Sequence, residues 1–351
     1  MVVSLPQYAL DFLHELSIHT SKKASTIKRY EYDLNIFFKW LNKKDKPTDL
    51  KGFQNLSMKD FEQFKEEQQY SNPTLKHFAM AIKQLQKYTD QTNNTSSVLP
   101  LEKLVSSISS TLSIEELMSE HDYVILIDSI RSIKGLTEQE LLVHDLLKER
   151  NVSILTLLYQ YGLTLQDVFS LNMENISFIQ HTITFVSSKG KQRLIFLKKE
   201  DSLQLYNYYI GIPEPVRPKY YSSDPFFVAV DFYRRTYKWE YETDSPKRLH
   251  MRSIQKMFKK EILRAKLRPA IQIQYLRNTS IVQKLIPIQN LEKEKRKNKE
   301  KEIKESFGLS DRAFHRYIQF VENNYEEIKE VLFSGYTEIQ ESLSQVAATL
   351  E

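Results

Sequence analysis

The sequence contains no cysteine, only 7 glycines in 351 residues and no long apolar run. The absence of cysteine excludes disulfide bonds, a thiol nucleophile and thiolate metal ligands. Average glycine usage is about 7%, and glycine-rich phosphate-binding loops need several glycines where the backbone approaches a ligand. A membrane-spanning helix needs roughly 18 consecutive apolar residues. We therefore expect no cofactor and no membrane-embedded segment.

The remaining composition is that of a folded protein. Hydrophobic residues make up 41% and charged residues 27%, which is ordinary for a globular chain, and the length suggests two or three domains. The N-terminus lacks the basic start and apolar centre of a secretory signal, so we expect a cytoplasmic protein. His14, Glu15 and His19 resemble a zinc-protease helix, but their spacing turns one histidine off the helix face. We predict no metal site.

Apolar residues recur at helical spacing in the N-terminal quarter. In residues 25–41 one face is apolar, and it consists of Ile27, Tyr30, Leu34, Phe37, Phe38 and Leu41. Ser25 is a candidate N-cap for this helix, and a second helical pattern begins at Asn72 and runs to Tyr88. Residues 90–97 are polar and aperiodic, as is typical of an exposed linker. We predict a four-helix domain over residues 1–90 and a linker over residues 91–112.

Residues 113–351 form the second predicted domain. Helical patterns run from about residue 113 to 168 and return over residues 203–209, 249–266, 273–285 and from 314 onward. Between residues 176 and 197 the period becomes that of strands, with residues 183–186 and 193–197 flanking a turn at residues 188–191. Residues 292–304 are nearly all charged with both signs mixed, which fits a solvated helix or a mobile loop. The predicted fold is mainly α with a small β-hairpin.

The positive charge is concentrated in one part of the chain. Residues 219–277 hold 14 Lys plus Arg against 6 Asp plus Glu, and this net of +8 exceeds the whole-chain charge of +5. Arg252, Lys256, Lys259 and Lys260 share one face of a predicted helix, opposite its apolar residues. Such a face is typical of a helix that follows DNA phosphates, and it is also compatible with a merely solvated surface.

Three segments, in this order and spacing, resemble the tyrosine recombinase (phage integrase) family from about residue 5 to 320. The first is the helix of residues 25–41 together with Asn-Pro-Thr-Leu at 72–75, which is similar to the family's core-binding domain. The second is Tyr-Gly-Leu-Thr-Leu at 161–165 with the turn at 188–191. The third is Tyr-Leu-Arg-Asn-Thr at 275–279 with Phe-Gly-Leu at 307–309 and Tyr317. The resemblance implies a two-domain clamp, in which residues 1–90 are the helical core-binding domain and residues 113–351 a larger α+β catalytic-like domain.

The resemblance also implies a set of catalytic positions, because family members cut DNA with a tyrosine assisted by arginines, a histidine or tryptophan, and a lysine in the hairpin turn. Three positions are replaced, by Thr164 for the first Arg, Gln274 for the His of a His-x-x-Arg element and Leu309 for the His after Gly308. Three are retained, as Lys189 in the turn, Arg277 and the nucleophile Tyr317. Removing one donor to the developing negative charge typically costs about 2.7 to 4 kcal/mol of transition-state stabilisation. These replacements predict that the chain does not cleave DNA.

The retained residues also have structural interpretations. Tyr317 is one of 20 tyrosines, and a helical tyrosine commonly serves as half-buried packing. Lys189 lies in a turn, where lysine also promotes solubility. Arg277 stands among apolar neighbours, so its head group needs a partner, and a DNA phosphate or a buried carboxylate fits equally well.

From this resemblance we predict a sequence-specific double-stranded DNA-binding protein of the bacterial nucleoid, similar to the integrase-fold repressors that maintain lysogeny in SPβ-like Bacillus prophages. The predicted DNA contacts are Lys28, Arg29, Lys76, Lys83, Lys189, Arg193, Arg252, Lys256, Lys259 and Arg277. Two alternatives stay open, namely an active but divergent integrase and a helical protein-interaction scaffold that uses the amphipathic end, residues 325–350. In the family the segment after the tyrosine helix docks on a neighbouring subunit, so the same end is a candidate for self-association.

Overall fold

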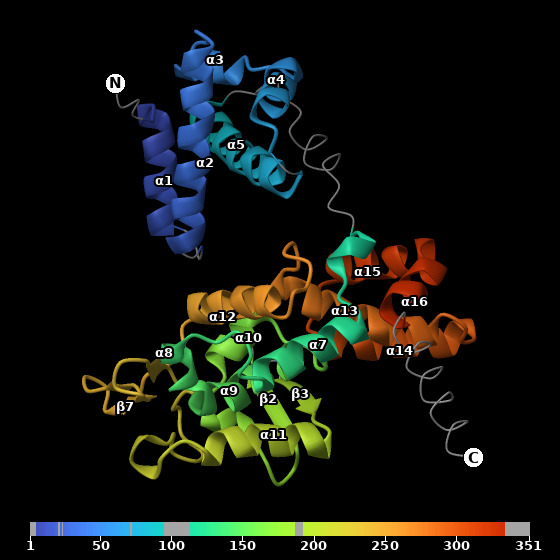
Figure 1. The fold of residues 1–351 in the computed structure, drawn as a ribbon. Helices are drawn as coiled ribbons and strands as arrows, with labels where there is room; N and C mark the ends of the chain where they lie inside the picture. Colours follow the sequence, from blue (N-terminus) through green and yellow to red (C-terminus); the bar gives the residue numbers. More distant parts are fainter. Residues whose placement is uncertain are drawn as a thin grey trace. The chain divides into compact units, whose positions relative to one another are not determined.

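The computed structural model describes residues 5–19, 22, 24–70, 72–94, 112–186 and 192–333. The chain divides into two compact units, Met1–Thr111 and Leu112–Glu351, coloured from blue to cyan and from green to red in Figure 1. The turn predicted at residues 188–191, with Lys189, lies outside the described residues, as does the chain beyond residue 333.

The first unit is helical. Its elements are α1 (Gln7–His19), α2 (Ala24–Lys43), α3 (Leu50–Gln54), α4 (Met58–Gln68) and α5 (Asn72–Asn93). The predicted apolar face of α2 is confirmed, because Leu34, Phe37, Phe38 and Leu41 are buried in the core of this unit, and Ile27 and Tyr30 pack at its edge. The four predicted helices are joined by the short α3, whose N-cap Asp49 accepts a hydrogen bond from the backbone of Gly52.

Two predicted helix ends differ from the observed ones. The helix α2 already includes Ala24, so Ser25 lies inside it and is not its N-cap, since alanine is the residue that extends a helix most readily. The helix α5 continues to Asn93, into the segment that we predicted as linker. Thr92 and Asn93 donate side-chain hydrogen bonds to the carbonyls of Tyr88 and Thr89, so these polar residues bond back to the preceding turn.

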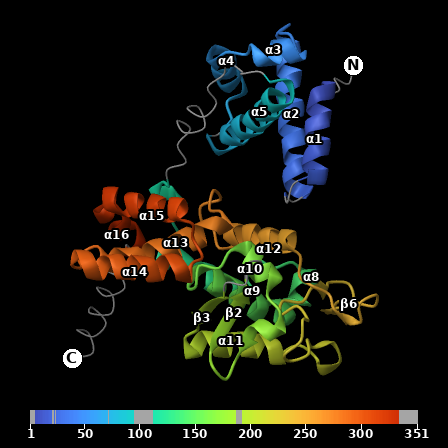
Figure 2. The same cartoon turned by 180° about the vertical axis from the view of Figure 1, so that it is seen from behind.

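The second unit is built around one central helix. Its helices are α7 (Glu120–Arg131), α8 (Glu138–Leu141), α9 (His144–Tyr159), α10 (Leu165–Ser170), α11 (Lys199–Ile210), α12 (Met251–Arg264), α13 (Ile273–Leu285), α14 (Lys293–Ser306), α15 (Asp311–Asn323) and α16 (Tyr325–Phe333), with 3₁₀ turns at Ile114–Glu116, Met173–Asn175, Glu214–Val216 and Ile286–Ile288. The central α9 packs against α7, α10, α11 and α13. In Figures 1 and 2, α12 and α13 run along one side of this unit and α11 along the opposite side.

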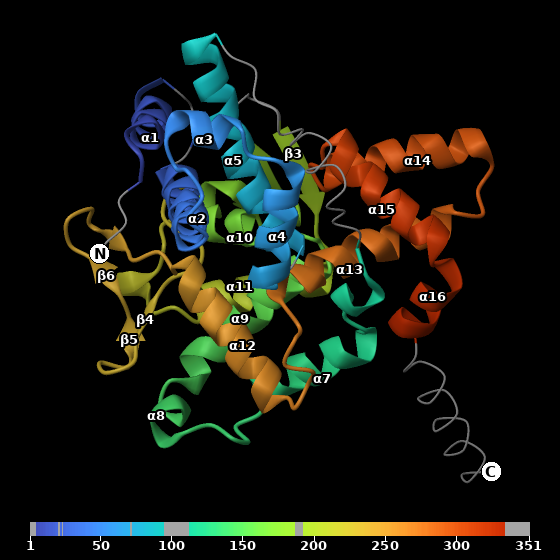
Figure 3. The ribbon, with the colours of Figure 1, turned by 90° about the horizontal axis from the view of Figure 1, so that it is seen from above.

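The predicted hairpin is present. Strands β1 (Ile176–Ser177), β2 (Thr182–Val186) and β3 (Gln192–Phe196) form an antiparallel sheet in that order, with Ile183 opposite Ile195. Two further ribbons pair β4 (Val230–Asp231) with β5 (Thr236–Tyr237) and β6 (Trp239–Glu240) with β7 (Ser245–Pro246). These strands have two residues each, too few to show a period of two in the sequence. Figure 3 shows the ribbons near the start of α12, and α14 to α16 on the far side of the unit.

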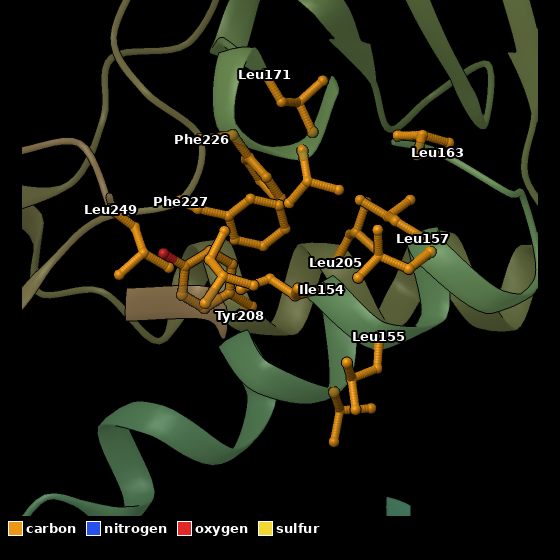
Figure 4. Packing of buried hydrophobic residues seen from close by; sticks show 14 of the residues in the cluster. Ile154, Leu155, Leu157, Leu163, Leu171, Leu205, Tyr208, Phe226, Phe227 and Leu249 are labelled. Atoms are coloured by element: carbon orange, nitrogen blue, oxygen red, sulfur yellow. The ribbon is translucent and has the colours of Figure 1, made fainter. Parts of the chain in front are cut away.

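Two hydrophobic clusters stabilise the second unit. The larger one joins α9 and α11 to the segment before α12, and Figure 4 shows Tyr208, Phe226 and Phe227 packed within it. The other surrounds α13, α15 and α16 and buries Ile328 and Leu332. Residues 325–333, the described part of the predicted amphipathic end, therefore bury their apolar side chains within the second unit.

The charged segment around residues 292–304 is the helix α14, which has no buried residue. The structure therefore supports the solvated helix rather than the mobile loop. Within the described residues, no helix combines the length and the apolar character that crossing a membrane requires.

Candidate nucleic-acid interface

Arg277 on α13 makes hydrogen bonds to backbone carbonyls. Its guanidinium donates to the carbonyl oxygen of Gly162 and to that of Phe307, at 2.7 Å for the latter, and it lies over the Phe307 ring. Only 6% of the residue is exposed, and burial lowers its pKa. The carbonyls at the end of α9 and the end of α14 accept the hydrogen bonds of this head group, and the charge of the Asp167 carboxylate also acts on it.

Gly162 allows the close approach on which this arrangement depends. Its φ is +56°, and a Cβ atom built there would lie 2.2 Å from the Phe307 ring. Glycine is the residue that adopts this left-handed conformation without strain and leaves the space open. The Gly-Leu and Phe-Gly segments that carry the resemblance thus meet in space.

Thr164 has a structural role at the position where the resemblance expects an arginine. It is the N-cap of α10, and its hydroxyl accepts a hydrogen bond from the backbone of Asp167 at 3.0 Å while the Asp167 carboxylate accepts one from the backbone of Thr164 at 2.9 Å. This reciprocal pair is a capping box, which satisfies two backbone donors at the start of the helix.

Arg193 on β3 forms an ion pair with the Asp167 carboxylate. Its guanidinium lies 2.9 Å from Asp167 and 4.8 Å from the Phe185 ring, and it donates to the Phe307 carbonyl at 3.3 Å. Burial alone would raise the pKa of Asp167, but the charge of Arg193 and the hydrogen bonds of Thr164 hold this pKa below its usual value. Arg193, which we predicted as a DNA contact, is 17% exposed and is engaged inside the protein.

Tyr317 on α15 is 3% exposed. Its hydroxyl donates a hydrogen bond of 2.8 Å to the side-chain oxygen of Asn278, and Gln274 makes a longer contact of 3.4 Å to the same oxygen. Burial raises the pKa of Tyr317, so the phenol is neutral at neutral pH. Leu309 packs at the edge of the hydrophobic cluster around α13 and α15.

These residues together form one internal network, which we call the Arg277 cluster. Its members are Thr164, Asp167, Arg193, Arg277, Asn278 and Tyr317. The structure brings together Thr164, Gln274, Arg277 and Tyr317 of the predicted catalytic positions, with Leu309 beside them. The prediction did not include Asp167, although Thr164 followed by Asp167 three residues later is a readable capping-box signal.

The predicted DNA contacts on the first unit differ among themselves. Lys28 is exposed on α2, whereas Arg29 forms an ion pair of 3.0 Å with Asp33, whose side chain is fully buried. Lys76 and Lys83 are half-buried on α5. Arg29 therefore holds a buried carboxylate of its own helix, since a buried charge needs a partner.

The helix α12 presents the cations that are most open to solvent. Arg252, Lys256 and Lys259 are exposed, while Ile254, Phe258 and Ile262 on the other face are buried. Lys260 pairs with Glu140. Within the described residues none of the three exposed cations has an ion pair, and we call Arg252, Lys256 and Lys259 the α12 basic face. The predicted division of this helix into a basic and an apolar face is confirmed.

The structure shows no group of three His, Asp or Glu side chains that could hold a metal ion among the residues it describes. Of the charged side chains described above, those that could contact a ligand are the lysines and arginines. A basic helix face of this kind can contact phosphates by charge and hydrogen bonds.

No family model and no curated protein matches the chain, but solved structures do. A structure of the XerH site-specific recombinase bound to palindromic difH substrate matches with a TM-score of 0.64 at 15% identity and covers 94% of this chain and 99% of that one. The Tn1549 transposon integrase with transposon right end DNA matches with a TM-score of 0.59 at 12% identity, over 89% and 94% of the two chains. A lambda integrase dimer bound to a COC' core site matches with a TM-score of 0.56 at 10% identity, over 90% and 95%.

These similarities establish the fold. The chain has the tyrosine-recombinase fold, mostly helical with small antiparallel sheets, over about nine tenths of its length. The predicted fold class is confirmed.

Proposed function

We propose that this chain is a sequence-specific double-stranded DNA-binding protein that does not cleave DNA. The single observation that carries this proposal is the contrast between two sets of cations. Arg277, at a catalytic position of the family, and the nearby Arg193 are bound to protein groups, whereas the α12 basic face has no ion-pair partner within the described residues.

The DNA part of the proposal rests on fold and charge together. The XerH, Tn1549 integrase and lambda integrase structures are complexes with DNA, and this chain shares their fold. A fold alone does not define a function. The basic face of α12 supplies the local chemistry, because exposed Lys and Arg side chains contribute most of the affinity of proteins for the DNA backbone.

The absence of cleavage rests on the Arg277 cluster. Strand cleavage requires a deprotonated hydroxyl and cationic donors that face the phosphate. Here the Tyr317 hydroxyl is buried and bound to Asn278, and Arg277 is bound to two carbonyls. Gln274 and Leu309 cannot carry a proton, and Thr164 cannot form the bidentate charged contact of an arginine.

A DNA-binding protein that keeps the integrase scaffold but does not cut fits the role of a transcriptional regulator. We propose a repressor of a bacterium or its prophage that maintains lysogeny, in line with the resemblance to integrase-fold repressors. Self-association through the C-terminal end belongs to the same proposal, since neighbouring structures include a dimer.

The test is a genome-wide capture of fragments bound by the purified full-length protein at low salt, followed by binding measurements on an enriched fragment at several salt concentrations. We expect one or a few enriched sites near promoters and an affinity that falls steeply with salt. Failure to enrich any fragment at low salt would contradict DNA binding. Enriched sites that the protein cuts would instead favour the active integrase.

A further inference from the structure

The second unit contains a cavity of about 460 Å³. Its wall is formed by α8, α9 and α12 together with the segment of residues 229–250, which includes the ribbons β4–β5 and β6–β7. Its volume lies within the range of about 300 to 1,000 Å³ that is typical of sites for small molecules. We call it the cationic cavity.

The charge of this cavity is strongly one-sided. Eight Lys and Arg residues line it, against two carboxylates, those of Glu140 and Glu261. Both carboxylates are already paired, with Lys260 and Arg264 respectively. Within the described part of the chain, four of the lining cations form no ion pair, and these are Arg150, Lys238, Arg248 and Lys256.

Arg150 is the most informative of these four. It is 6% exposed, and its guanidinium donates to the Val228 carbonyl at 3.1 Å and to the side-chain oxygen of Asn151 at 3.2 and 3.3 Å. Both acceptors are neutral. They satisfy some of the hydrogen-bonding groups, but they leave a full positive charge in a region of low dielectric constant. Burial of a charge without a counter-ion is costly, so such a residue favours an anionic ligand beside it.

Arg248 repeats the same arrangement on another part of the wall. It donates to the carbonyl of Phe169 at 2.8 Å and to the side chain of Asn172 at 2.7 Å, and burial lowers its pKa. Two guanidinium groups in one cavity are therefore fixed in position by neutral acceptors while their charges remain uncompensated. Groups held in this way are preorganised for an anionic ligand.

The remaining wall is apolar. Leu147, Val230, Phe232 and Met257 are among the lining residues. A free inorganic anion would gain nothing from these side chains. An anion joined to an apolar group would satisfy the arginines and bury hydrophobic surface in the same site.

We propose that the cationic cavity binds a small organic anion, a phosphate or carboxylate attached to an apolar body, and that this ligand weakens the binding of DNA. The second part rests on the proposed function. Lys256 lines the cavity and also belongs to the α12 basic face. An anion bound beside it lowers the positive potential that attracts DNA phosphates.

The first experiment measures ligand binding without DNA. Phenyl phosphate is titrated into the full-length protein by calorimetry, with inorganic phosphate and phenol as separate probes that each offer only one half of the chemistry. We expect saturable one-to-one binding of phenyl phosphate with a Kd of about 1 mM or tighter, at least tenfold tighter than either fragment. Equal affinity for phosphate and phenyl phosphate, or no saturable binding in this range, would overturn the proposal.

Two variants locate the site. Lys238→Ala removes an exposed lining cation that is not part of the α12 basic face, and it should weaken phenyl phosphate binding several-fold. Lys259→Ala is the matched control, because Lys259 is exposed on α12 but does not line the cavity. It should leave phenyl phosphate binding unchanged. Arg150→Met should abolish that binding. If the substitution of this buried arginine prevents folding, Lys238→Ala still tests the site.

The second experiment adds DNA. Phenyl phosphate should lower the affinity for an enriched fragment in the wild type and much less in Lys238→Ala, with inorganic phosphate added to the control at matched ionic strength. Binding of phenyl phosphate by a protein that binds no DNA would refute the proposed function and leave the cavity site intact. Binding of DNA without binding of phenyl phosphate would refute the cavity site alone. Loss of DNA affinity in Lys238→Ala with unchanged phenyl phosphate binding would assign the cavity to the DNA surface and overturn this inference.

Discussion

The Arg277 cluster and the α12 basic face are both rich in positive charge, but they use it differently. In the cluster, Arg193 is paired with Asp167 and Arg277 donates to two carbonyls. On α12, Arg252, Lys256 and Lys259 project from a helix whose other face is buried. The cations of the Arg277 cluster stabilise the fold, whereas those of the α12 basic face are available to a partner. A matching residue type in a sequence motif therefore does not show that its charge is available.

The largest expected effect comes from a substitution in the Arg277 cluster. Arg277→Ala removes a buried guanidinium, which leaves the carbonyl of Gly162 without its donor and that of Phe307 with the contact of Arg193 alone. Leaving a buried polar group unsatisfied costs about 1 to 3 kcal/mol, so we expect a loss of about 2 to 3 kcal/mol in the free energy of unfolding, measured by urea denaturation. Arg252→Ala is the control and should change stability by less than about 0.5 kcal/mol. An unchanged stability of Arg277→Ala together with a loss of DNA binding would make Arg277 a phosphate ligand.

The next largest effect comes from substitutions in the α12 basic face. Replacing Arg252, Lys256 and Lys259 together by Ala should weaken binding to an enriched fragment at least tenfold, about 1.4 kcal/mol, and should reduce the salt slope by about one for each DNA phosphate that is no longer neutralised. Fluorescence anisotropy at several salt concentrations measures both quantities. Stability should stay nearly constant because these side chains are exposed. An unaltered slope would show that α12 does not contact DNA.

A smaller effect tests the role of Thr164. Thr164→Ala removes the N-cap of α10, and the loss of such a cap typically costs about 1 kcal/mol of stability. Thr164→Ser keeps the hydroxyl and should be close to the wild type in thermal or urea unfolding. Equal stability of the two variants would show that Thr164 does not act as a cap.

The smallest effect depends on pH. The pKa of Asp167 is lower in the folded protein than its usual value of about 3.9. The charged form therefore stabilises the fold above that value, and this contribution is lost as pH falls through the lower, folded pKa. Urea unfolding of the wild type and of Asp167→Asn should differ by a constant amount above about pH 5. The difference should shrink at lower pH, and a difference that grows on acidification would contradict the ion pair with Arg193.

Local patterns predicted the fold well. The apolar face of α2 and the strands β2 and β3 follow from spacing along short stretches of sequence, and the structure confirms them. The two-residue strands β4 to β7 have no such period. The ends of α2 and α5 differ because single residues such as Ala24 and Asn93 decide where a helix begins and ends.

The site was harder to predict, because its contacts join distant parts of the chain. Arg277 meets the carbonyl of Gly162, 115 residues away, and Arg193 meets that of Phe307, 114 residues away. No local pattern reports such pairs. The capping box of Thr164 and Asp167 can be predicted from the local sequence. The resemblance instead implies an arginine at the position of Thr164, and it says nothing of a helix cap there.

The central claim is that the chain binds DNA without cleaving it, and one measurement tests it most directly. The protein is incubated with an enriched fragment that carries a nick near the binding site, which would trap a covalent intermediate, and the mixture is resolved under denaturing conditions. We predict that the same fragment is bound in native gels and gives no covalent protein–DNA adduct. An adduct that disappears in Tyr317→Phe would contradict the account, because it would show that the Tyr317 hydroxyl leaves Asn278 and attacks a phosphate.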